Sequence, residues 1–180
     1  HEFILTLRDT ALANDQAGPR TNGFATKHEI DFSRLQALPG TLSLFLRFYQ
    51  QTVYKKNLDA SEGISIGGPT AVRAYPVGEG SGDTGRLAQA ELRYAMGDFS
   101  AYMFLDHARV KVNAVLYDNT PNGRELAAAG VGIRTSGKLP NTQVLNTTDL
   151  AMGWAKHGGD PQSDAAARSP RIWLTTSFRF

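Results

Sequence analysis

The sequence predicts an all-β fold of antiparallel strands, and three observations support it. Long runs alternate apolar and polar residues with a period of two, as over residues 41–54. No segment has the 3.6-residue period of an amphipathic helix. Turn signals such as Leu38-Pro39-Gly40 and Gly97-Asp98 separate the runs. We therefore expect a meander of hairpins.

Composition restricts the classes of function. With 180 residues the chain is long enough for one domain with a substantial core. The 19 Lys plus Arg nearly balance the 17 Asp plus Glu, so the chain lacks the excess of positive charge that is typical of a nucleic-acid-binding protein. The lack of cysteine excludes disulfides and thiol catalysis. No segment approaches the roughly 18 apolar residues of a membrane helix, although barrel strands would leave hydropathy unremarkable.

The first three predicted strands each present one apolar face. These faces are carried by Phe3, Leu5 and Leu7 in residues 2–9, by Phe24, Ile30 and Phe32 in the run from residue 24 to about 33, and by Leu42, Leu44, Leu46 and Phe48 in residues 41–54. A strand as long as residues 41–54 is unusual in a soluble sheet, where about five or six residues are typical. The length suits a tilted strand that crosses a bilayer.

The later strands continue the alternation. A polar turn at residues 55–62 and a short strand before residue 66 come first. The five strands that follow cover residues 86–96, 99–114, 125–135, 146–157 and 171–180. Their polar faces carry full charges such as Glu91 and Arg93. A soluble sandwich or lipocalin would show the same alternation, so periodicity alone leaves open whether lipid or water surrounds the sheet.

Residues 66–85 form the longest predicted loop. Six glycines and two prolines exclude helix and regular strand there, because glycine costs entropy and proline lacks a donor. A structureless loop of this length is usually functional.

The last strand alternates apolar residues up to Phe178 and the terminal Phe180. This pattern is similar to the assembly signal of bacterial outer-membrane barrels. An ordinary closing strand that ends on phenylalanine is the alternative.

The long loop also resembles a known family. Its motif residues are Gly67, Gly68, Val72, Arg73, Tyr75, Gly82 and Asp83. They resemble the sixth extracellular loop of the TpsB transporters of two-partner secretion, which are haemolysin-activator and haemagglutinin-secretion proteins related to BamA. Ala74 stands where that family usually has glycine. Similar residues occur at 32–36, 57–62, 104–106 and 130–132 and in the terminal strand.

The resemblance implies a transmembrane outer-membrane β-barrel in a Gram-negative bacterium. Residues 1–180 would be the eight or nine C-terminal strands of a larger, sixteen-strand barrel, with the POTRA domains absent. A count of nine strands and a start in mid-pattern also predict a fragment, because bacterial barrels have even strand numbers.

The function implied is export of a large TpsA-type exoprotein, such as a haemolysin or filamentous adhesin, through a pore. Expected partners are that exoprotein, outer-membrane lipid and the barrel assembly machinery, without nucleic acid. Two alternatives stay open: a small self-closing barrel that secretes nothing, and a soluble ligand-binding sandwich.

In TpsB proteins the loop arginine pairs with a strand aspartate, which implies that Arg73 binds Asp106. Asp106 shares a strand face with Phe104, and a carboxylate shielded from water needs a cationic partner. Ala108 replaces a glycine of the family pattern. The alternative is that Arg73 is a solvated loop charge.

Other groupings of polar residues lack the spacing of a catalytic or metal site. Asp83, Glu79 and Glu62 match no cation loop. His28, His107 and His157 lack zinc-ligand spacing, and no helix follows the glycine-rich loop to bind phosphate. We therefore expect no catalytic residue, metal or cofactor.

Overall fold

The computed structural model describes residues 2–12, 23–138, 140, 142–164 and 168–180. The main sheet is antiparallel and has eight strands in the order β1-β2-β3-β6-β7-β8-β9-β10. Its strands are β1 (Glu2–Leu12), β2 (Gly23–Ala37), β3 (Leu42–Tyr54), β6 (Thr84–Met96), β7 (Phe99–Lys111), β8 (Gly123–Lys138), β9 (Leu145–His157) and β10 (Arg171–Arg179). The all-β antiparallel prediction is thus confirmed.

A second, much smaller sheet lies beside the main one. It pairs β4 (Ile64–Ser65) with β5 (Ser81–Gly82), and a 3₁₀ turn, η1 (Ala60–Glu62), precedes it. The main sheet has eight of the nine strands counted in the sequence, because the short strand before residue 66 (β4) pairs with β5 instead. Strand β5 lies in the segment predicted to lack strand. It forms because Gly82 lets the chain approach β7: a Cβ on Gly82 would lie 2.3 Å from the Lys111 carbonyl oxygen.

Several strand ends also differ from prediction: β1 runs to Leu12 instead of residue 9, and β2 runs to Ala37 instead of about residue 33. Strand β7 ends at Lys111 instead of residue 114, and β8 begins at Gly123, inside a predicted loop, and runs to Lys138 instead of residue 135. The Asn122 side chain pairs with the backbone of Asn113, so the chain leaves the ladder just after Lys111 and turns back.

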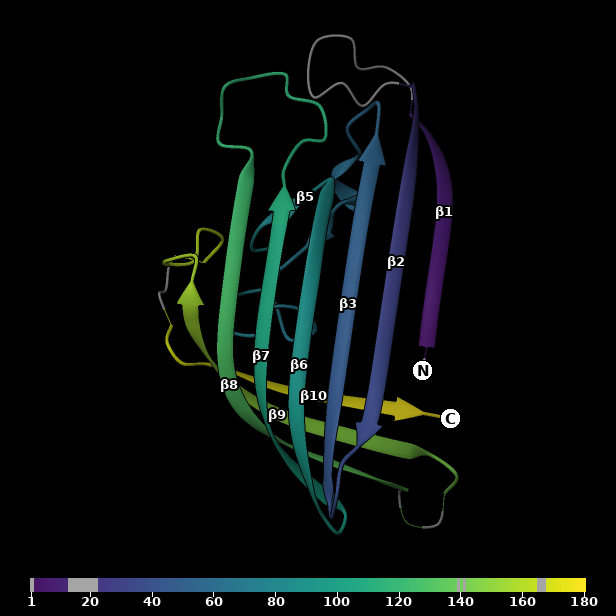
Figure 1. Cartoon of the computed structure of the whole chain (residues 1–180), viewed down its shortest axis with the longest axis vertical. Helices are drawn as coiled ribbons and strands as arrows, with labels where there is room; N and C mark the ends of the chain where they lie inside the picture. The colour runs from purple at the N-terminus through teal and green to yellow at the C-terminus, as the bar shows by residue number, and fades with distance from the viewer. Residues whose placement is uncertain (1, 13–22, 139, 141, 165–167) are drawn as a thin grey trace.

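The sheet is strongly curved. Strands β9 and β10 cross behind β6 and β7, and the chain between β4 and β5 lies on the concave side (Figure 1). We call this concave side the trough; its lining includes Gln51, Glu91, Asp106 and Leu126, all buried. Within the described residues β1 and β10 do not pair, so the sheet is open.

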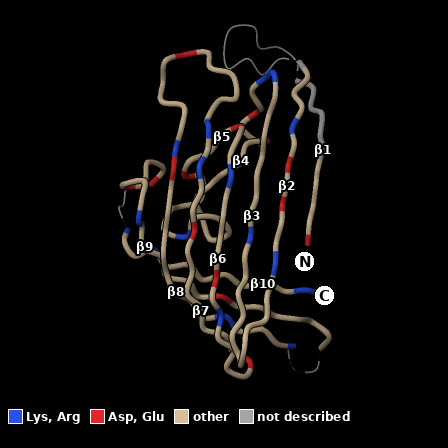
Figure 2. The backbone as a smooth tube through the Cα atoms, viewed as in Figure 1, with Lys and Arg blue, Asp and Glu red and all other residues tan. Residues whose placement is uncertain are grey.

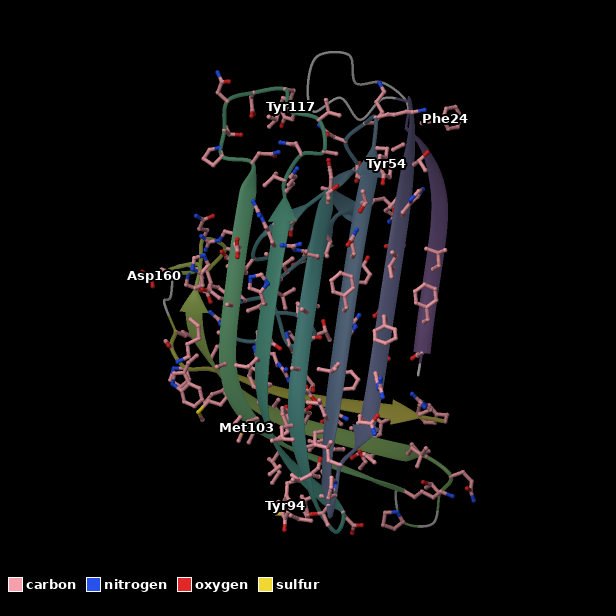
Figure 3. The ribbon with its side chains drawn as sticks, in the orientation of Figure 1. Phe24, Tyr54, Tyr94, Met103, Tyr117 and Asp160 are labelled. Carbon is pink, nitrogen blue, oxygen red and sulfur yellow. The ribbon has the colours of Figure 1, made fainter. Side chains whose placement is uncertain are left out.

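The convex face is exposed and apolar. Met103 and Leu105 on β7 are 59% and 64% exposed, while Tyr102, Phe104 and Asp106 between them are buried. Short turns join the strands at one end and long loops at the other (Figure 1). Phe24, Tyr54 and Tyr117 lie at the loop end and Tyr94 near the turn end (Figure 3). Aromatic residues at both ends are typical of the two membrane interfaces of a barrel.

Among the described residues, no helix has the length and apolar character needed to cross a membrane.

Candidate functional site

Residues 66–80, which we call the inner loop, fold as a compact unit inside the trough. The amide groups of Gly67 and Gly68 donate to the carbonyl oxygens of Glu79 and Tyr75, and that of Val72 donates to Ile66. A Cβ on Gly67 would lie 2.3 Å from the Pro76 carbonyl oxygen, so this crossing requires glycine. The loop packs on the sheet through buried apolar side chains, namely Ile66, Ala71, Val72, Ala74, Tyr75, Leu87, Ala108, Val110, Leu126 and Ala128.

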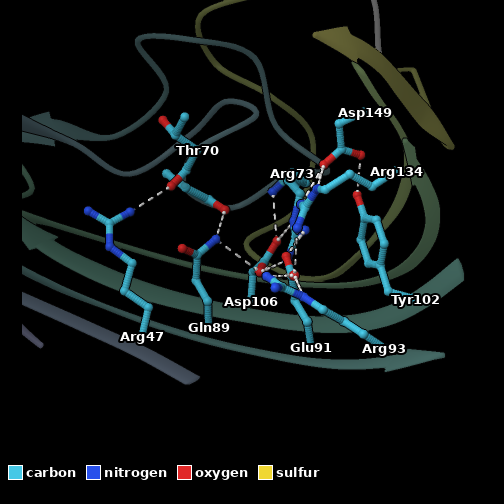
Figure 4. Close-up of polar contacts among 11 residues, drawn as sticks. Arg47, Thr70, Arg73, Gln89, Glu91, Arg93, Tyr102, Asp106, Arg134 and Asp149 are labelled. Atoms are coloured by element: carbon cyan, nitrogen blue, oxygen red, sulfur yellow. Dashed lines mark hydrogen bonds and ion pairs between the residues drawn. The ribbon is translucent and has the colours of Figure 1, made fainter. Parts of the chain in front are cut away.

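Arg73 lies at the centre of the buried polar contacts (Figure 4). Its Nε donates to Asp106 Oδ2 at 2.9 Å and its Nη2 to Asp106 Oδ1 at 2.8 Å, a bidentate pair. The backbone amide of Arg73 donates to the same carboxylate at 3.1 Å. Its Nη1 donates to Glu91 Oε1 at 2.6 Å. Arg73 is only 3% exposed, so it is not the solvated loop charge that was the alternative.

Aromatic side chains enclose this arginine. The Arg73 guanidinium carbon lies 3.6 Å from the ring centroid of Phe104, a cation–π contact. The Trp173 indole nitrogen donates to the Arg73 carbonyl oxygen at 2.8 Å. Glycines on β8 make room for the strand rings: a Cβ on Gly130 would lie 2.3 Å from Phe104, and one on Gly132 would lie 2.3 Å from Tyr102.

The charges around Arg73 balance. The cations are Arg73, Arg93 and Arg134, and the anions are Glu91, Asp106 and Asp149. Glu91 binds both Arg73 and Arg93, at 2.6 Å each, and Asp149 binds Arg134 and the Tyr102 hydroxyl. A buried charge is tolerated only when it is paired and hydrogen-bonded, and this network meets that condition.

A polar cavity of about 380 Å³ adjoins this network. Its lining includes Arg47, Arg93 and Arg134 from the strands and Thr70 from the inner loop. Arg47 pairs with Asp31 at 2.8 Å and also donates to the Thr70 carbonyl oxygen at 3.4 Å. One side of the inner loop thus faces an open, charge-lined space.

Asp83 fastens the base of the inner loop to two neighbouring segments. Its Oδ1 accepts from the Leu58 amide at 3.2 Å and its Oδ2 from the Ala114 amide at 2.9 Å. Burial raises the pKa of this carboxyl above its ordinary value, although both amides oppose the effect. Glu62, one of the acidic residues considered with Asp83, instead pairs with Lys27 at 2.8 Å.

Glu79 fastens the far end of the inner loop to residues 158–164, the segment that follows β9. Its carboxylate accepts from the amides of Gln162 and Ser163 at 2.9 Å each, from the Ser163 hydroxyl at 2.8 Å and from Arg124 at 2.7 Å. Tyr75 strengthens this attachment, because its hydroxyl proton is shared between the carbonyl oxygens of His157 at 2.7 Å and Gly159 at 3.0 Å. Glu79, Asp83 and Glu62 therefore fasten separate segments and do not form a common metal site.

The contacts of Glu79 predict that acid releases residues 158–164. Burial alone would raise the pKa of the Glu79 carboxyl, but the bonds from Ser163, Arg124 and Gln162 outweigh it and lower the pKa below its ordinary 4.5. A lowered folded-state pKa means that the stabilisation is complete above about pH 4.5 and is lost as the pH falls through the folded-state value. We expect amide protection at Gln162 and Ser163 to be constant above this pH and to fall below it.

Hydrogen exchange, corrected for its intrinsic pH dependence, measures this protection. Glu79→Gln should lower the protection at neutral pH and remove its dependence on acid. Asp98→Asn, at an exposed turn between β6 and β7, is the matched control and should leave both unchanged. Equal protection of the native chain at pH 7 and pH 3 would contradict the prediction.

Phe178 and Phe180 lie away from this site. Phe178 is on β10 and is 53% exposed, and Phe180 follows the strand and is almost fully exposed. Among the described residues, no hydrogen bond or ring contact joins Phe178 or Phe180 to the inner loop. Their exposed positions are compatible with a role in barrel assembly.

An open, curved antiparallel sheet with an apolar convex face and aromatic ends is typical of a segment of an outer-membrane β-barrel. The chain belongs to the family described as haemolysin secretion/activation protein ShlB/FhaC/HecB, whose model matches residues 10–135. The resemblance to TpsB transporters is therefore confirmed. Proteins of this family secrete or activate exoproteins at the outer membrane of Gram-negative bacteria. Neither the curated proteins nor the solved structures contain a significant match to the chain.

Proposed function

We propose that this chain is the C-terminal barrel segment of a transporter that moves a large TpsA-type exoprotein, such as a haemolysin or filamentous adhesin, across the outer membrane. The observation that carries the proposal is the position of the inner loop, which lies inside the trough and is fixed there by the buried Arg73. A barrel used for export needs an interior that is closed at rest and can open. A loop held by polar bonds at separate points can leave without unfolding the strands.

The open sheet supports the proposal that further strands complete the barrel. Backbone groups of an unpaired strand cannot be left in lipid, because each unsatisfied group costs several kcal/mol. Strands β1 and β10 have no second neighbour among the described residues. Residues 1–180 would then be one part of a larger barrel, which argues against the small self-closing barrel.

The family supports transport without catalysis. The three acidic residues that could be imagined as an acid–base set, Glu62, Glu79 and Asp83, are each engaged with a cation or with backbone amides. In our proposal these contacts hold segments together and carry no chemistry.

Deletion of the coding region in the source bacterium tests the function. We expect a large exoprotein to disappear from the culture medium and to return when the gene is supplied again. Other outer-membrane proteins should stay at their normal level, which shows that general barrel assembly is intact. An unchanged set of secreted proteins would contradict the proposed function.

A further inference from the structure

Three cations gather on the convex face at the loop end of the sheet. Arg86 on β6 and Arg109 and Lys111 on β7 are exposed and alternate with inward-facing residues. Figure 2 shows Lys and Arg positions close together near the loop ends of these two strands. The trough does not use these side chains.

None of the three cations forms a direct ion pair among the described residues, although Glu125 attracts Arg109 electrostatically. Arg86 and Arg109 stand directly opposite each other in the ladder, and Lys111 is one step further, opposite Thr84. Like charges directly opposite on one face are destabilising. The acidic residue next in register, Glu125 opposite Arg109, binds His107 at 2.9 Å. Among the described residues no ion pair involves Arg86, Arg109 or Lys111.

The position of the cluster matches the depth of lipid headgroups. From Arg109 towards the short-turn end, β7 exposes first His107, which pairs with Glu125, and then Leu105, Met103 and Phe99 on the convex face. Ten residues of strand span about 33 Å, or about 25 Å across a membrane at a typical tilt, which is the height of the apolar band of a barrel. Long loops mark the extracellular end of such barrels. The cations therefore lie at the upper border of the band, in the outer leaflet.

We propose that Arg86, Arg109 and Lys111 bind the phosphate groups of an anionic lipid in the outer leaflet. An arginine fork matches phosphate geometry, and a phosphate between Arg86 and Arg109 removes their mutual repulsion. A hollow of about 390 Å³ is lined by all three cations and by the polar Gln50 and Thr52. The site rests on the membrane placement of the proposed function but not on secretion.

Lipid titration of the whole transporter that contains this segment, purified from the outer membrane in neutral detergent, tests the site. The probes are diphosphoryl lipid A, the same lipid without its phosphates, and inorganic phosphate, with bound lipid counted by native mass spectrometry. The test variant combines Arg86→Gln, Arg109→Gln and Lys111→Gln. The matched control combines Arg34→Gln, Lys138→Gln and Arg179→Gln, which removes three exposed charges near the short-turn end of the sheet. A compact, heat-modifiable band on a gel reports folding of each variant.

We expect the native chain and the control to bind the phosphorylated lipid, and the test variant to bind it on the order of tenfold or more weakly. The lipid without phosphates should bind all three alike, and inorganic phosphate should not replace the lipid. Equal binding by test and control variants, or full displacement by inorganic phosphate, would overturn the lipid site while leaving transport intact. Absence of the protein from the outer-membrane fraction would overturn the membrane placement and the site together.

Discussion

Replacing Arg73 by alanine is expected to remove most secretion of the exoprotein while the barrel still inserts. The substitution deletes the bidentate pair with Asp106, the bond to Glu91 and the cation–π contact with Phe104. Breaking one side of a buried ion pair costs about 3–5 kcal/mol, because the remaining carboxylate stays buried without its partner. The equilibrium that holds the inner loop in place would then be weakened by roughly a hundredfold to several thousandfold, since about 1.4 kcal/mol is a factor of ten. Without its anchor the loop would move about inside the trough instead of leaving it as one compact unit, and this would obstruct the proposed path of the exoprotein.

The strands themselves do not depend on Arg73, because their ladders run between neighbouring strands along their whole length. Secretion is measured as exoprotein in the medium, and insertion as heat-modifiable barrel in the outer membrane. Arg73→Lys tests the geometry: a single ammonium cannot reproduce the bidentate fork, so we expect secretion to stay well below the native level. Arg34→Ala, at an exposed position of β2, is the control. Native secretion by the Arg73→Ala chain would contradict an anchoring role.

The strands and their faces could be predicted from the sequence because side-chain direction alternates with a period of two. On β7 this rule alone places Tyr102, Phe104, Asp106 and Ala108 together, and the structure buries all four. The rule fails for very short strands. Ser81–Gly82 pairs only because Gly82 crosses close to Lys111, and a dipeptide has no period to detect.

The inner site was only partly predictable. The family resemblance pointed to Arg73 and Asp106, which lie 33 residues apart. Alternation placed Glu91 and Arg93 on one polar strand face, and Glu91 does face the trough. Alternation cannot tell which cation a carboxylate binds. Trp173 lies 100 residues from Arg73, and the segment that Glu79 binds is more than 80 residues away. Such contacts depend on the curvature of the sheet, which local sequence does not encode. What the motif residues do in transport remains a prediction.

Valine at Gly130 is expected to prevent the site from forming and to reduce the folded barrel itself. Gly130 lies on β8 between Phe104 on β7 and Gly153 on β9. A Cβ there would lie 2.2 Å from the Met152 carbonyl oxygen and 2.3 Å from the Phe104 ring. The Met152 carbonyl oxygen belongs to the backbone and cannot move without shifting β9. Rotation of the Phe104 ring alone would therefore not make room for valine. Overpacking in a close-packed interior typically costs about 1–3 kcal/mol, and a backbone clash places this site at the upper end.

Gly137→Val provides the matched comparison, since it makes the same change on the same strand. A Cβ on Gly137 meets nothing within 4 Å, and valine favours a strand more than glycine does. The heat-modifiable fraction after refolding and the midpoint of thermal unfolding should both fall for Gly130→Val and be equal to or above native for Gly137→Val. Because Phe104 is the ring beneath Arg73, a Gly130→Val barrel that folds should also release the inner loop to proteases. A stable, protease-resistant Gly130→Val barrel would mean that β8 and β9 can separate without disturbing Arg73, and that the ring contact contributes little to holding the loop.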